Sequence, residues 1–136
     1  MTNSRAKGAS AEREVFKILS AGLGFPVERN LEQTRAGGAD TTIGRWAVEV
    51  KRQEVTLLNA WWQQAVEQAQ RLNKSPRESG YATVPMLIYR RSRMPWRAIV
   101  FVADLVESFK GTVIREELAG ETVEITLPMA IQLLRT

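Results

Sequence analysis

One short alternating segment, set between two helical patterns, constrains the fold of this chain most. Residues 46–51 read Trp-Ala-Val-Glu-Val-Lys, so a large apolar residue occupies every second position, which is the period of a β-strand. The same alternation places Glu49 and Lys51 side by side on the opposite face of that strand. A helical stripe of apolar residues precedes the strand at 9–23, and a second follows it at 56–73. Strands interleaved with amphipathic helices predict a layered α/β domain.

The remaining patterns extend this order into a mixed central sheet flanked by helices. When the extended segment at 26–31 is counted as a strand, the pattern predicts an α-β-β-β-α-β core. A further strand, at 97–102, follows that core. We expect a single domain over 1–136, with a core at about 5–102 and a C-terminal extension at 103–136 that packs on the core or at a dimer interface. The predicted elements are a helix at 9–23, an extended segment at 26–31, strands at 40–44 and 46–51, a helix at 56–73, strands at 84–90 and 97–102, a short helix at 103–110, a strand at 122–127 and a helix at 129–135.

Two absences from the sequence narrow its chemistry. The chain has no cysteine, so it has no disulfide, no thiolate nucleophile and no thiolate zinc site. It has no histidine, so the commonest general base and the commonest transition-metal ligand are missing. A bound metal must therefore be held by oxygen atoms, which favours magnesium, manganese or calcium. A general base must be a carboxylate, a lysine or an activated water.

Charge and hydropathy indicate the class of partner. The net charge of +4 makes the protein modestly basic, which favours polyanionic partners. No apolar run approaches the ~20 residues that cross a bilayer, and residues 1–10 lack the apolar centre of a signal peptide. We therefore expect a cytoplasmic protein with no membrane partner.

Three residues on the predicted 40–51 hairpin have the chemistry of a divalent-metal site. Asp40 and Glu49 lie on neighbouring strands, where two carboxylates can converge on one hard cation. Lys51 shares a face with Glu49, so its ammonium group could position a water molecule or neutralise charge on a phosphate. Each residue also has a structural interpretation: Asp40 as a turn residue after glycines, and Glu49 with Lys51 as a solvent-facing pair.

The order of these residues resembles the PD-(D/E)xK nuclease superfamily, and most closely the archaeal Holliday-junction resolvases and their phage relatives. The resemblance covers about residues 5–102, whereas residues 103–136 have no counterpart. The family places a metal-binding glutamate on its first helix, a glycine-bearing loop before an aspartate, and then a Glu-x-Lys strand. The matching elements are Lys7-Gly8, Glu12-Arg13-Glu14, Gly24-Phe25 with Arg29, Gly37-Gly38-Ala39-Asp40, Glu49-Val50-Lys51, Pro85-Met86-Leu87 and Trp96-Arg97.

The resemblance implies a restriction-endonuclease-like fold and a nuclease active site. By that resemblance, Glu12, Asp40 and Glu49 bind Mg²⁺, for which Mn²⁺ can substitute, and Lys51 assists the nucleophile. It also implies hydrolysis of branched DNA in recombination or repair, either in the cell or, for a phage protein, in the host cytoplasm. A symmetric junction needs two cuts, so a homodimer is the expected assembly.

Other residues are candidates for supporting roles. Some branches of the superfamily carry a glutamine on the second helix, and Gln64, on the same flank as Gln68, is the best match. Trp61 and Trp62 lie on the apolar stripe and are expected in the core or at a dimer interface. Arg90, Arg91, Arg93 and Arg97 form a cluster that could follow a second stretch of DNA backbone. The candidate DNA-binding residues near the site are Arg5, Lys7, Arg29, Arg35 and Arg52.

Two alternatives stay open on the sequence alone. The first is a nuclease that acts on linear, nicked or flap DNA. The second is a non-catalytic DNA-binding module on a nuclease-like fold. An intact set of three carboxylates and a lysine favours an enzyme over the binding module.

Overall fold

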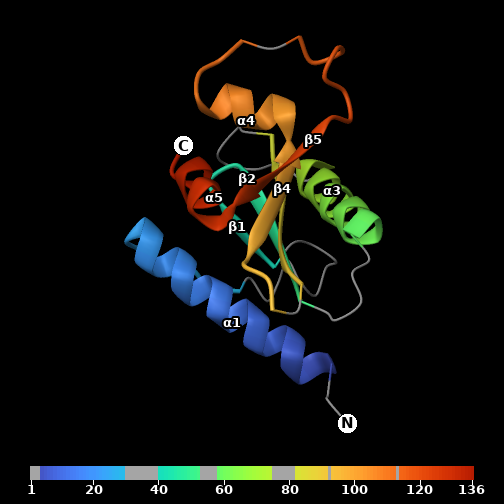
Figure 1. The fold of residues 1–136 in the computed structure, drawn as a ribbon. Helices are drawn as coiled ribbons and strands as arrows, with labels where there is room; N and C mark the ends of the chain where they lie inside the picture. The colour runs from blue at the N-terminus through green and yellow to red at the C-terminus, as the bar shows by residue number, and fades with distance from the viewer. Residues whose placement is uncertain (1–3, 30–39, 53–57, 75–81, 92, 113) are drawn as a thin grey trace.

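A five-stranded mixed sheet forms the centre of the computed structural model, which describes residues 4–29, 40–52, 58–74, 82–91, 93–112 and 114–136 (Figure 1). The strand order is β1-β2-β3-β4-β5, in which β2 and β3 are parallel and every other neighbouring pair is antiparallel. The strands are β1 (Thr41–Ile43), β2 (Trp46–Arg52), β3 (Val84–Arg90), β4 (Arg97–Phe101) and β5 (Thr122–Thr126), and the helices are α1 (Ser4–Leu23), α3 (Leu58–Lys74), α4 (Val102–Ser108) and α5 (Leu127–Leu134). The predicted α/β class, a mixed sheet flanked by helices, is confirmed.

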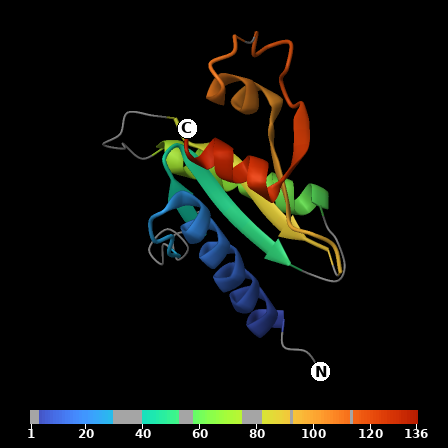
Figure 2. The same ribbon diagram turned by 60° about the vertical axis from the view of Figure 1, so that its left-hand side comes forward.

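Helices cover both faces of this sheet (Figures 1 and 2). On one face, α1 and α5 pack over Val48, Met86 and Val100, which are fully buried. On the other face, α3 packs through Trp61 against Leu87. Burial on both sides is typical of strands in a parallel pair, which explains why Ala47 and Glu49, on the second face of β2, are buried as well.

The helix and strand bounds follow the predicted periodicities closely, with two differences. Helix α1 begins at Ser4, five residues before the predicted start at residue 9. The segment predicted as extended at 26–31 forms no strand over 26–29, and its last two residues lie outside the described residues. Pro26 has no N–H group to donate to a ladder, and Thr41 Oγ1 instead donates to the Glu28 carbonyl oxygen at 2.9 Å. The described residues therefore show two strands, not three, between α1 and α3.

The C-terminal elements are joined to the sheet by strand pairing and by a buried polar link. β5 pairs with β4 along its whole length, and Leu133 of α5 is fully buried in the main core. The Arg45 guanidinium, at the β1–β2 turn, donates to the Asp104 carbonyl oxygen at 2.9 Å and to Ser108 Oγ at 2.7 Å, which joins α4 to that turn. No helix in the described part of the chain is long and apolar enough to cross a membrane.

Truncation of a side chain on α5 tests whether this helix belongs to the core. Leu133→Ala should lower the free energy of unfolding by about 2–5 kcal/mol, because Leu133 is fully buried between α5 and the sheet. Met129→Ala is the matched control on the same helix: Met129 is 41% exposed and should change stability by less than about 1 kcal/mol. Urea unfolding of both variants measures the difference, and equal losses would contradict the packing of α5.

Candidate active site

Asp40 and Glu49 meet at the end of the β1–β2 hairpin. Asp40 directly precedes β1, and the register that pairs Thr41 with Val48 continues to place it beside Glu49. The Val50 backbone N–H donates to Asp40 Oδ2 at 2.8 Å, which fixes the carboxylate against β2. The predicted pairing of Asp40 with the Glu-x-Lys strand is therefore present in the fold.

Glu49 is buried, and only one of its two carboxylate oxygens has a partner among the described residues. Its Oε1 lies 3.3 Å from Lys51 Nζ, as expected from their shared face of β2. Its Oε2 is buried and has no hydrogen-bond partner within the described part of the chain. Lys51 is the more accessible of the two, with 23% of its side chain exposed against 5% for Glu49. An unpartnered buried carboxylate oxygen costs stability unless another group compensates for it. Because Asp104 Oδ2 on α4 is unpartnered as well, what distinguishes Glu49 is that Asp40 and Lys51 lie beside it.

The carboxyl groups of the site hold their protons more tightly than free carboxyl groups do. Burial, with the neighbouring Asp40 charge as the second cause, raises the pKa of Glu49 from 4.5 to about 7, against the opposing effect of Lys51. Burial also raises the pKa of Asp40, although the hydrogen bond from Val50 opposes the change. The pKa of Glu12 is raised by burial and then by Asp40. These shifts mean that the three carboxyl groups lie within electrostatic reach of one another and that too little positive charge surrounds them.

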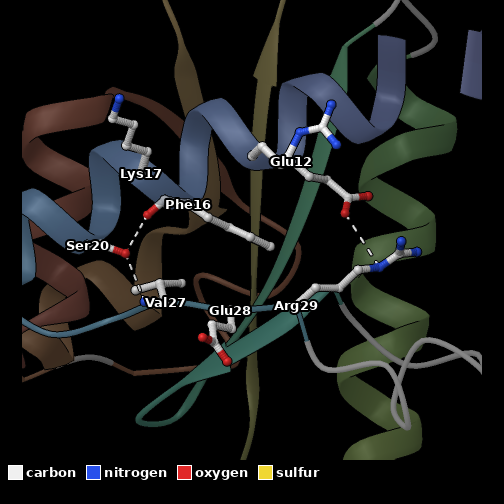
Figure 3. A pocket seen from close by; sticks show the side chains of 8 residues that line it. Glu12, Phe16, Lys17, Ser20, Val27, Glu28 and Arg29 are labelled. Carbon is white, nitrogen blue, oxygen red and sulfur yellow. Dashed lines mark hydrogen bonds and ion pairs between the residues drawn. The ribbon is translucent and has the colours of Figure 1, made fainter. Parts of the chain in front are cut away.

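Glu12 reaches the site from α1 and is paired with Arg29 (Figure 3). Arg29 Nε lies 3.5 Å from Glu12 Oε2. The segment that carries Arg29 is held against α1 by Ser20, whose Oγ donates to the Phe16 carbonyl oxygen at 2.7 Å and accepts from the Val27 N–H at 2.8 Å. The predicted DNA-binding residue Arg29 thus lies beside one of the predicted metal-binding residues.

A cavity of about 430 Å³ opens beside Glu12, between α1 and the segment that follows it (Figure 3). Three of its residues are cationic and two are acidic, so it can receive an anionic group next to the carboxylates. Its lining residues are Glu12, Arg13, Phe16, Lys17, Ser20, Val27, Glu28 and Arg29.

The donor set of the site fits a hard divalent cation. Among the described residues, no group of three acidic side chains is arranged to hold a metal ion as it stands. Magnesium, however, is usually held by one or two carboxylates and keeps several waters, so Asp40 and Glu49 suffice as protein ligands. The unpartnered Glu49 Oε2 and the raised pKa of Glu49 both indicate negative charge that a cation would compensate.

The structure says less about the roles of the other predicted site residues. Gln64 is half-buried on α3 and makes no hydrogen bond with Glu49 or Lys51, so its role stays a prediction. Trp61 is a core residue, and Trp62 makes an edge-on contact with Phe101, with 5.0 Å between the ring centroids. Arg5 and Lys7 belong to α1, but their side chains lie outside the described residues, as does all of Arg35.

Two residues near the site were not singled out from the sequence. Gln68, one turn after Gln64, is the buried glutamine of α3, and its Oε1 has no partner. Glu14 pairs with two arginines, at 4.0 Å from Arg52 and 3.3 Å from Arg90. The Glu-Arg-Glu motif contained Glu14, but only the fold shows that its carboxylate pairs with Arg52 and Arg90.

Comparison with known proteins agrees with this geometry. No curated protein and no solved structure matches the chain. Residues 3–127 match the family described as "Phage putative PDDEXK endonuclease", which spans Glu12, Asp40, Glu49 and Lys51 and indicates a nuclease. The chain belongs to this phage PDDEXK endonuclease family.

Proposed function

We propose that this protein is a magnesium-dependent endodeoxyribonuclease whose metal site is formed by Asp40 and Glu49, with Glu12 as a third acidic group. The observation that carries the proposal is the buried pair Asp40 and Glu49, in which Glu49 Oε2 has no partner among the described residues and Lys51 lies 3.3 Å from Oε1. Asp40 lies beside Glu49 and adds to the rise that burial causes in its pKa, so two carboxyl groups and a lysine converge at one point of the sheet.

Each residue has a role that its surroundings support. Asp40 and Glu49 would hold Mg²⁺, or Mn²⁺ in its place, through carboxylate oxygens. When bound, the ion supplies Lewis acidity to the scissile phosphate and lowers the pKa of an attacking water. Lys51 Nζ is placed to orient that water or to donate to a phosphate oxygen as negative charge develops. Arg29, with 42% of its side chain exposed beside Glu12, supplies positive charge where the DNA backbone would enter.

We infer branched DNA as the substrate, with a homodimer making the paired cuts. This narrower proposal is supported by the resemblance of residues 5–102 to junction resolvases. A two-fold assembly carries two active sites related by symmetry, as a symmetric four-way junction requires.

A cleavage assay across DNA structures tests the proposal. Purified protein is incubated with end-labelled four-way junction, flap, nicked and linear duplex DNA of matched sequence, with Mg²⁺, with Mn²⁺ or with chelator. We expect cleavage with either metal and none with chelator, and the junction should be cut fastest. Analytical ultracentrifugation, with and without junction DNA, measures the dimer.

The outcomes separate the parts of the proposal. The absence of metal-dependent cleavage on every substrate would reject the nuclease and favour a DNA-binding module. Equal or faster cutting of linear, nicked or flap DNA would keep the nuclease and reject the junction as its preferred substrate. A monomer that still makes paired cuts would reject the dimer.

A further inference from the structure

A second cavity, of about 710 Å³, lies at the turn of the β3–β4 hairpin and is not part of the metal site. Three arginines line it: Arg90 at the end of β3, Arg93 in the turn and Arg97 at the start of β4. Turn residues 94–96 and residues 126–128, where β5 leads into α5, form its remaining wall. We call this cavity the hairpin pocket. The described residues that line it include no acidic side chain.

The positive charge of the hairpin pocket is poorly compensated. Within the part of the chain that the structure describes, Arg93 and Arg97 form no ion pair. Arg90 shares the Glu14 carboxylate with Arg52, so one negative charge serves two guanidinium groups. A concave surface lined with one sign of charge concentrates ligands of the opposite sign.

The contacts of Arg90 and Trp96 favour a phosphate backbone over a nucleobase as the ligand. Arg90 Nε donates to the Met94 carbonyl oxygen at 3.0 Å, and its guanidinium lies 6.0 Å from the centroid of the Trp96 ring. Trp96 is buried, and its Nε1 donates to Glu14 at 3.4 Å, so its ring is not free to stack on a base. The groups left accessible are guanidinium donors beside an apolar surface that includes the exposed Met94, and they suit phosphate oxygens and sugar respectively.

The hairpin pocket lies at the same end of the sheet as the proposed active site. The parallel register of β2 and β3 pairs Lys51 with Tyr89 and Arg52 with Arg90. Figure 2 shows the C-terminal end of β2 beside the β3–β4 hairpin. Neighbouring strands are about 4.8 Å apart, so Arg97 on β4 is on the order of 10 Å from Lys51 on β2. That separation corresponds to about three nucleotides of rise along one DNA strand.

We propose that the hairpin pocket binds the sugar-phosphate backbone of DNA about three nucleotides from the scissile phosphate. The inference rests on the proposed nuclease function, because it takes the Lys51 end of β2 as the place of cleavage. Arg93 and Arg97 contact phosphate directly, while Arg90 is held in place by Glu14 and Trp96. The pocket is an anchor that aligns the substrate strand with the metal site, and it contributes no group to the chemical step.

The salt dependence of DNA binding tests this anchor. Dissociation constants of full-length protein for a labelled duplex are measured in chelator, where no cleavage occurs, over a range of salt concentrations. Arg93→Gln and Arg97→Gln should each weaken binding severalfold and reduce the slope of log Kd against log salt by about 0.9. Arg97→Lys should restore most of the slope, because it keeps the charge.

Lys110→Gln is a closely matched control. Lys110 is exposed at the end of α4 and outside the pocket, and its φ of 61° nearly equals the 62° of Arg93. Arg93→Gln and Lys110→Gln each remove one positive charge at a residue with left-handed backbone geometry. They therefore share any general effect of net charge or of backbone strain. Lys110→Gln should keep the wild-type slope.

The results distinguish this inference from the nuclease proposal. Slopes for Arg93→Gln and Arg97→Gln that equal that of Lys110→Gln would overturn the anchor, even if the protein cleaves DNA. Reduced slopes in a protein that cleaves nothing with any divalent cation would show that the hairpin pocket binds the DNA backbone, but would reject both the nuclease and the pocket's role in aligning a strand for cleavage. Thermal melting of each variant shows whether a loss of binding comes from unfolding.

Discussion

Asp40→Asn should lower the rate of DNA cleavage at least about 10³-fold, or about 4 kcal/mol of transition-state stabilisation, and leave the protein folded. The amide oxygen of asparagine can still accept the hydrogen bond that Val50 N–H donates to Asp40 Oδ2, so the end of the hairpin keeps its geometry. The substitution removes one of the two negative charges that a divalent cation would require. Single-turnover cleavage at saturating Mg²⁺ measures the rate.

Lys51→Ala should give a loss of about 10²–10³-fold, because one charged donor near the scissile phosphate is removed while both carboxylates remain. Binding of DNA in chelator should stay within a few-fold of wild type for both variants, since contacts to the phosphate backbone supply most of the affinity.

Asp104→Asn is the matched control for these substitutions. Asp104 is also a buried aspartate, at 1% exposure, but it pairs with Arg115 at 3.2 Å and lies at the opposite end of the sheet from Asp40. Its replacement should alter stability and leave the cleavage rate per folded molecule near that of wild type. Equal losses of cleavage in Asp40→Asn and Asp104→Asn would mean that Asp40 acts only through the fold.

The parts of this structure that follow a local period could be predicted from the sequence. The alternation in 46–51 placed Glu49 and Lys51 on one face, and the distance of 3.3 Å between them confirms it. Helical spacing predicted one apolar face of α1, formed by Ala11, Val15, Ile18 and Gly22 and flanked by Leu19. Of these, Ala11, Val15 and Leu19 are buried, and Ile18 packs partly buried against the core. Such patterns are readable because each depends on the geometry of a single element.

The extent to which the site is buried could not be predicted from a local period. The sequence left open whether Glu49 and Lys51 face solvent, because burial depends on how α3 covers that face of the sheet. Covering by a helix is a tertiary property, and it is what raises the pKa of Glu49. Gln68 was missed for the same reason: its spacing from Gln64 defines a shared flank of α3 but not which of the two is buried.

Contacts between segments that are far apart in the sequence could not be predicted from local patterns either. Arg45 looked like a turn residue, yet it donates to Asp104 and Ser108, which follow it by about sixty residues. Glu14 was visible only as part of a motif, yet it joins Arg52 to Arg90 across two strands. The register of β2 against β3 brings these arginines together, and a parallel pair is set by the whole crossover instead of by a short turn.

Glu49→Gln should raise the stability of the protein and abolish cleavage at the same time. A buried carboxylate that binds a cation destabilises the fold when no cation is present. The folded protein holds the Glu49 proton up to a pKa of about 7, whereas the unfolded chain releases it near 4.5. Between these values the folded state binds more protons, so the free energy of unfolding falls as pH rises through the window. The difference between 4.5 and about 7 corresponds to a loss of about 3 kcal/mol above pH 7.

Glutamine cannot ionise, so Glu49→Gln should lack this part of the loss and keep only the decline that the raised pKa values of Asp40, Glu12 and Asp104 produce. In metal-free buffer at pH 8 the variant should be more stable than wild type by about 1–3 kcal/mol, although it cleaves no DNA. Millimolar Mg²⁺ at pH 8 should stabilise wild type and not the variant, because bound metal favours the ionised carboxylate. Urea unfolding from pH 5 to pH 8 with and without Mg²⁺ measures all three effects. Parallel pH profiles for the two proteins would show that Glu49 is compensated by its own neighbours, and its burial would then give no reason for a cation at this site.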